Sequence, residues 1–178
     1  MKAAACALVF AGVSAAQMCS TLAPRRALEA ASSRAGGVLR SEPVGRLQSG
    51  ETRADFTAFA VSDPVHVGHE LRGVRVELAS PEYSGVVYIE GAEIAAVKAR
   101  ADWLARMARD YPNETAPFAI GGARDDPACP LAFTYQRIGS SVILRLRGLE
   151  LIHDFELGGV APSELVAILA RAAKALKR

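Results

Sequence analysis

The chain has 178 residues, of which 51% are hydrophobic, so it is long enough for one domain with a substantial core. Its net charge of +2 is unevenly distributed: residues 1–53 hold seven basic and three acidic residues, and residues 54–178 hold fourteen and sixteen. The C-terminal part is therefore mildly acidic, which argues against nucleic acid as a partner. Three cysteines fit neither a disulfide framework nor a zinc spacing, although a Cys19–Cys129 bond and free thiols both remain open. No phosphate-loop or calcium-loop motif is present, so we expect no cofactor.

Residues 1–16 predict a signal peptide, because Lys2 is followed by an apolar run and by the small residues Ser14-Ala15-Ala16. The run is shorter than the roughly 20 apolar residues that span a bilayer, so we expect no stable membrane span after cleavage. Residues 17–54 are rich in Arg, Ala and Ser, which is typical of a flexible basic linker or of a transit-like segment. We therefore expect export to the periplasm or the extracellular space. The alternative is an organelle reached by a signal plus a transit-like leader.

The domain itself is expected to cover residues 55–178. Alternating apolar residues or short apolar runs between turn residues predict strands at 56–61, 70–78, 86–90 and 116–121. Residues 92–110 predict a helix that ends before Pro112. Its apolar stripe has helical spacing and consists of Ile94, Val97, Ala101, Leu104 and Ala108.

The stretch from Leu131 to Leu176 predicts three strands and a helix. Gly139-Ser140 is a two-residue hairpin turn, which places Tyr135 opposite Leu144 and Phe133 opposite Leu146. A second turn at Gly148-Leu149 would place Glu150 opposite Arg147 and His153 opposite Leu144, with Phe155 and Leu157 on the apolar face. Pro162 then begins a helix with the stripe Leu165, Ile168, Leu169, Ala172 and Leu176.

These elements predict an α+β fold, an antiparallel β-meander of about six strands packed on two amphipathic helices. The segments Glu93–Val97 and Glu164–Ile168 each open a helix after a strand. This similarity makes two strand-then-helix halves plausible, although five positions do not establish a repeat.

Two groups of residues are candidates for binding a protein partner or an anionic ligand. Trp103 and Met107 lie one turn apart and away from the main stripe of their helix, so they either pack, for instance against residues 56–70, or form a contact site. Arg145 and Arg147 lie on the polar face of the hairpin, where a basic strip would attract an anion or an acidic partner. A solvated strand face with Glu156 alongside is the other interpretation of that strip.

A metal-dependent enzyme is the alternative function. His66 and His69 are flanked by carboxylates and would supply two imidazole ligands, with His153 as a distant third. Pro64 and Gly68 place the pair in a loop or at the start of a strand, and i, i+3 side chains of a strand point to opposite faces. A solvated loop is the other interpretation.

The run Val87–Ile94 and the segment Phe155-Glu156-Leu157 leading into Ser163-Glu164-Leu165 resemble a family of small, uncharacterised exported or targeted α+β domains. The resemblance covers residues 70–178 and departs from the family around residues 121–130. It implies the same order of strands, helix, meander and closing helix, and it carries over no catalytic residue. The sequence thus predicts an exported, non-catalytic binding or accessory domain.

Overall fold

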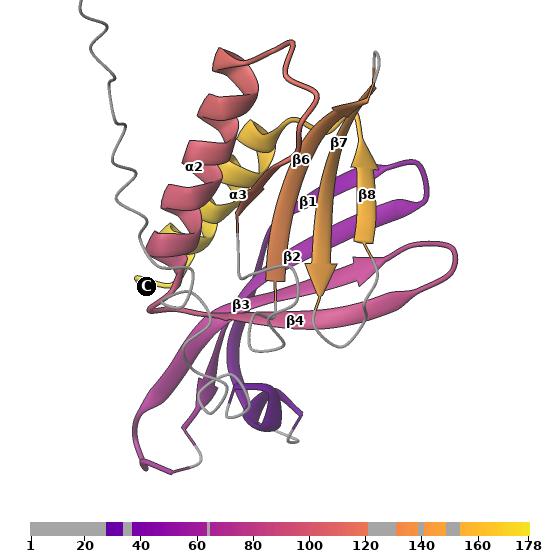
Figure 1. Ribbon diagram of the computed structural model, residues 1–178. Helices are drawn as coiled ribbons and strands as arrows, with labels where there is room; N and C mark the ends of the chain where they lie inside the picture. The colour runs from indigo at the N-terminus through magenta and orange to yellow at the C-terminus, as the bar shows by residue number, and fades with distance from the viewer. Residues whose placement is uncertain (1–27, 34–36, 64, 121–130, 139–140, 149–153) are drawn as a thin grey trace, which may run out of the picture.

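The computed structural model describes residues 28–33, 37–63, 65–120, 131–138, 141–148 and 154–178 (Figure 1). These residues form two four-stranded antiparallel sheets, each a meander followed by a helix. The first half contains β1 (Val38–Ser49), β2 (Thr52–Ser62), β3 (Glu70–Ala79), β4 (Ser84–Glu90) and α2 (Ile94–Asp110). The second half contains β5 (Phe118–Ile120), β6 (Leu131–Ile138), β7 (Ser141–Gly148), β8 (Asp154–Gly158) and α3 (Pro162–Ala175).

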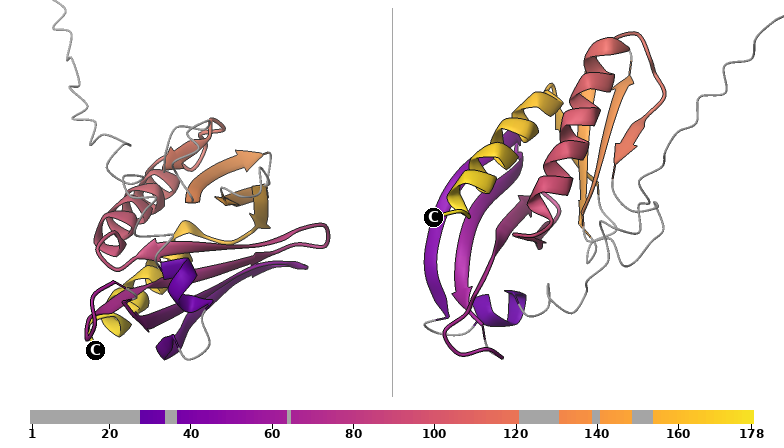
Figure 2. Two further views of the ribbon diagram at one scale, coloured as in Figure 1. Left: turned by 90° about the horizontal axis from the view of Figure 1, so that it is seen from below. Right: turned by 90° about the vertical axis from the view of Figure 1, so that its left-hand side faces the viewer.

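The α+β class with antiparallel strands is confirmed, but the single meander of about six strands is wrong. Each half folds as four strands and one helix, which is the two-half organisation suggested by the similarity of the two helix openings. Strands β6–β8 cross the direction of β1–β4, and α2 and α3 lie side by side along one flank of both sheets (Figures 1 and 2). Among the described residues, no helix combines the length and the apolar character needed to cross a membrane.

One core joins the two sheets and the two helices. The first sheet contributes Leu47, Phe56, Val76 and Leu78, and the second contributes Phe133, Tyr135, Phe155 and Leu157. The helices contribute the apolar stripes predicted from their spacing, with Ile94, Val97, Ala101 and Leu104 buried on α2 and Leu165, Ile168, Leu169 and Ala172 buried on α3. Because both helices bury their stripes in this one core, their opposite faces remain at the surface.

The sheet begins earlier in the chain than the expected domain start at residue 55. Residues 38–49 form β1, although they fell within the predicted linker. This strand lies at the edge of the first sheet, and Val44 and Leu47 are its buried residues. An edge strand tolerates Pro43, and a register shift lies between Pro43 and Gly45, so its pattern does not show the usual alternation. The predicted signal peptide, residues 1–16, lies outside the described residues.

The predicted register of the β6–β7 hairpin is confirmed, because Tyr135 pairs with Leu144 and Phe133 with Leu146. The predicted β7–β8 register is wrong by four residues, since Arg147 pairs with Asp154 and Leu144 with Leu157. The residues that connect the two strands, 149–153, lie outside those that the structure describes. An even shift preserves the two faces of a strand, so Phe155 and Leu157 still face the core.

A second, smaller cluster covers the other face of the first sheet. Residues 28–32 are helical, and their Leu28 and Ala31 bury Phe59 and Val61 of β2. Because side chains alternate along a strand, these two residues point away from the main core, to which Phe56 and Ala58 contribute. The hydroxyls of Ser32 and Tyr88 lie 3.1 Å apart and tie this segment to β4.

Candidate functional site

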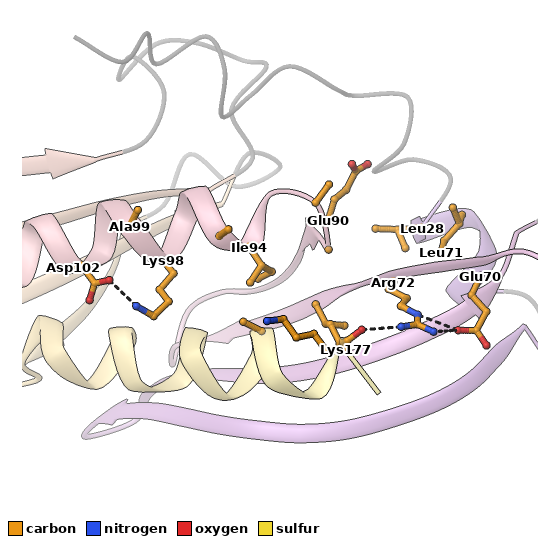
Figure 3. A pocket seen from close by; sticks show the side chains of 15 residues that line it. Leu28, Glu70, Leu71, Arg72, Glu90, Ile94, Lys98, Ala99, Asp102 and Lys177 are labelled. Atoms are coloured by element: carbon orange, nitrogen blue, oxygen red, sulfur yellow. Dashed lines mark hydrogen bonds and ion pairs between the residues drawn. The ribbon is translucent and has the colours of Figure 1, made fainter. Parts of the chain in front are cut away.

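The described part of the chain contains an apolar groove of about 660 Å³. It lies where α2 begins and α3 ends, and the adjoining ends of β3 and β4 close it (Figure 3). Its walls are mainly apolar and combine residues distant in sequence: Leu28, Leu71, Ile94, Ala95, Ala99, Ala173 and Leu176. We refer to it as the helix-end groove.

The helix-end groove is hollow because small alanine side chains line it on both helices. Ala95 and Ala99 are four residues apart and share one exposed face of α2, while Ala173 faces them from the last turn of α3. Two helices with larger side chains at these positions would fill the seam between them by interdigitation. With a methyl group at each of the three, the helices stay in contact through their buried stripes and leave an apolar concavity above them.

Arg72 sets the position of the groove's end wall. Its Nη1 donates to the carbonyl oxygen of Leu176 at 2.9 Å, which satisfies a carbonyl at the C-terminus of α3. Its Nε and Nη2 lie 3.0 Å and 2.9 Å from Glu70 Oε2. At the β4–α2 turn, the Gly91 N–H donates to the Arg72 carbonyl oxygen at 2.8 Å, so one residue of β3 contacts both ends of the groove.

Charged side chains line the rim. Lys98 Nζ lies 2.7 Å from Asp102 Oδ2, one helical turn further along α2. Lys177 is exposed at the end of α3 and makes no ion pair with any residue that the structure describes. The groove therefore offers an apolar floor, two neutralised pairs, the carboxylate of Glu90 on its β4 side, and at the α3 end one lysine available to an incoming anion.

Trp103 and Met107 do not line this groove. Trp103 is partly buried, packs against the main core, and meets the ring of Phe118 edge-on at a centroid distance of 6.4 Å. Trp103 is therefore a packed residue, but it packs against Phe118 of β5 and not against residues 56–70. Met107 is also partly buried. A contact role for these two residues stays a prediction.

The basic strip of Arg145 and Arg147 lies on β7. The strand register places Arg145 beside Glu156 and Arg147 beside Asp154, so acidic residues accompany both arginines along the sheet. Such a charge-balanced face attracts anions less than an isolated basic strip does. The side chains of both arginines lie outside what the structure describes, so their role in binding stays a prediction.

His66 and His69 lie in the turn between β2 and β3, where both are exposed. Their ring centroids are 5.9 Å apart, and His66 Nδ1 lies 2.9 Å from Asp63 Oδ2. A hydrogen bond from the Val65 N–H and another from the His66 side chain hold the pKa of Asp63 below its usual value. Within the described ranges, no three potential metal ligands come together. His153 lies outside them, so the metal-dependent alternative stays a prediction.

Comparison with family models, with curated proteins and with solved structures found no match to this chain. The resemblance to small exported α+β domains therefore stays a hypothesis. The groove was missed in the sequence because its walls come from four separate segments, and alanines on a helix carry no chemical signal of their own. The recurrence of Ala95 and Ala99 on the exposed face of α2 was the one available sign.

Proposed function

We propose that this chain is an exported binding domain without catalytic activity of its own, and that the helix-end groove holds its ligand. The observation that carries the proposal is the groove itself, because its volume of about 660 Å³ and its mainly apolar walls are those of a small-molecule site. The charged residues on its rim support binding over catalysis. Lys98 and Asp102 pair with each other, as do Arg72 and Glu70, in a stabilising arrangement.

The ligand class follows from the walls and the rim. Leu71 and Leu176 are the partly exposed large apolar residues of the walls, so most of the ligand is hydrocarbon. Lys177 is the lysine on the rim that has no acidic partner among the described residues, and it favours an anionic group at one end. We infer a largely apolar ligand with a single carboxylate or a comparable anion. Export would give such a domain access to ligands outside the cell.

Calorimetric titration with dodecanoate, below its micellar concentration, tests this proposal. We expect saturable one-to-one binding that Ala99→Trp abolishes, because the indole would fill the groove from an exposed helix position at little cost in folding. Ala96→Trp is the matched control, since Ala96 is exposed on the same helix but does not line the groove. Equal affinity of the two variants would contradict the proposal, as would the absence of binding to the unchanged protein.

The lysine is tested separately. Lys177→Gln should weaken dodecanoate binding up to about fivefold, the effect of an exposed ion pair of about 1 kcal/mol. Dodecanol, which lacks the charge, should bind the unchanged protein and the variant alike. If Lys177→Gln kept full affinity for dodecanoate, Lys177 would not bind the carboxylate of the ligand, and the groove would remain only an apolar site.

A further inference from the structure

A second cavity of about 910 Å³ lies at the opposite end of the α2–α3 seam. Its walls are the C-terminal half of α2, the turn from β8 into α3, and the first turn of α3. The two helices are antiparallel, so the end of the seam that carries the C-terminus of α2 carries the N-terminus of α3 (Figure 2). Asp102 borders both cavities, and its pairing with Lys98 neutralises it.

The N-terminus of α3 is open toward this cavity. Ala161 occupies the N-cap position and has no side-chain acceptor, and Pro162 at the first helical position has no N–H. The Glu164 side chain turns back to accept from the Ala161 N–H at 3.1 Å, and the Glu164 N–H donates to the Ala161 carbonyl at 3.0 Å. The Ser163 amide thus lacks a side-chain cap and lies at the positive end of the helix dipole.

Tyr135 provides an independent sign of a ligand. Its ring belongs to the main core and its side chain is only 5% exposed, yet the residue lines this cavity. The hydroxyl, its one polar side-chain atom, makes no hydrogen bond with the residues that the structure describes. This hydroxyl is not among the buried unsatisfied atoms of the described residues, so it opens onto the cavity, where it can donate to a bound group.

Two arginines complete the wall. Arg106 is exposed on α2 and makes no ion pair within the described ranges. Arg109 Nε donates to Asp110 Oδ1 at 2.8 Å, so its charge is partly neutralised. The cavity thus combines a helix N-terminus whose Ser163 amide has no side-chain acceptor, the hydroxyl of a nearly buried tyrosine and an unpaired guanidinium, and all three favour the same kind of ligand.

We propose that this cavity is a phosphate-binding site, in which the Ser163 amide, the Tyr135 hydroxyl and the Arg106 guanidinium donate to the phosphate oxygens. The site is separate from the helix-end groove and does not depend on its ligand. The phosphate is either free or the end of a phosphomonoester, and both present the same oxygens to these donors.

Titration of the full chain with orthophosphate, followed by calorimetry and by the amide resonance of Ser163, tests the proposal. We expect saturable one-to-one binding, with affinity reduced about tenfold or more in Tyr135→Phe and in Arg106→Gln, since each removes a donor to a charged group. Tyr111→Phe and Arg40→Gln are the matched controls. Both residues are exposed outside the cavity, and both variants should retain the affinity of the unchanged protein.

Parallel titration with glycerol 3-phosphate distinguishes the two sources. Tighter binding than that of orthophosphate assigns the site to a phosphomonoester, and equal or weaker binding assigns it to free phosphate. Arg106 is exposed, so Arg106→Gln folds and remains informative even where Tyr135→Phe loses stability. The proposal is overturned if orthophosphate shows no saturable binding up to 10 mM, or if Arg106→Gln binds it as tightly as Arg40→Gln does.

Discussion

Arg72 Nη1 donates a hydrogen bond of 2.9 Å to the carbonyl oxygen of Leu176, and it thereby joins β3 to the C-terminus of α3 across 104 residues of chain. This bond connects the first ββββα half with the helix of the second. It also holds the last turn of α3 against the end of β3, where the helix-end groove is open. The shape of the groove therefore depends on Arg72, whose guanidinium also forms an ion pair with Glu70.

Replacing Arg72 by Met tests this link, since methionine keeps the aliphatic part of the side chain but has no donor. We expect the free energy of unfolding to fall by about 1 kcal/mol in urea denaturation, because the Leu176 carbonyl loses its partner. Arg75→Met is the matched control. Arg75 pairs with Glu77 on its own strand and its side chain is 43% exposed, so we expect a change within about 0.5 kcal/mol. Equal losses in the two variants would contradict the role of Arg72.

Trp103→Ala distinguishes packing from an idle surface residue. Because Trp103 is partly buried and contacts Phe118, we expect a loss of about 2 kcal/mol, below the 3–5 kcal/mol typical of fully buried aromatic residues. Thermal unfolding followed by circular dichroism measures it, since the variant has no tryptophan fluorescence. An unchanged melting temperature would instead support the contact role predicted for Trp103.

Gly45 of β1 lies directly against α3. A Cβ at residue 45 would lie 2.7 Å from Ile168 Cγ1, and next to it Arg171 Nε donates to the Val44 carbonyl at 2.6 Å. We expect Gly45→Ala to reduce the free energy of unfolding by about 1–3 kcal/mol in urea denaturation, because the helix must shift. At Gly158 the nearest atom to an added Cβ is Ser49 Oγ at 3.6 Å, so Gly158→Ala should be nearly neutral. The reverse order of the two effects would contradict this packing.

The β2–β3 turn should weaken in acid. The Val65 N–H and the His66 side chain stabilise the ionised form of Asp63, which lowers its folded-state pKa below the ordinary value of 3.8. The ionised carboxylate therefore contributes stability above pH 3.8, and this contribution is lost as the pH falls through the lower folded-state pKa. A ¹³C titration of the Asp63 carboxyl should show a midpoint below 3.8 that rises in His66→Ala. A midpoint at or above 3.8 would show that these hydrogen bonds do not form in solution.

An element could be predicted when residues next to it in the sequence determined its boundary or its register. The β6–β7 register followed from strict alternation around a two-residue turn, and the α3 boundary followed from Pro162. The β7–β8 register had no comparable restraint, because the length of the connection was unknown. The even shift left the faces correct while it changed the partner of Arg147.

Other features had no local signal at all. Strand β1 carries Pro43 and a register shift, and most of its residues are exposed, so its composition matched a linker. The division into two sheets depends on which strands pair at a distance, and alternation within a strand does not determine that. Both cavities arise where α2 and α3 fail to fill the seam between them. Such a hollow follows from tertiary packing and not from any motif.

The central claim is that the helix-end groove is a ligand site, and mapping of amide chemical-shift changes on titration with dodecanoate tests it most directly. The account predicts that the saturable changes cluster in residues 94–102 and 173–177 and at Leu71 and Arg72, which line the groove from its two helices and β3. They should disappear in Ala99→Trp and persist in Ala96→Trp. Changes confined to β5–β8, or spread evenly over the surface without saturation, would contradict the claim.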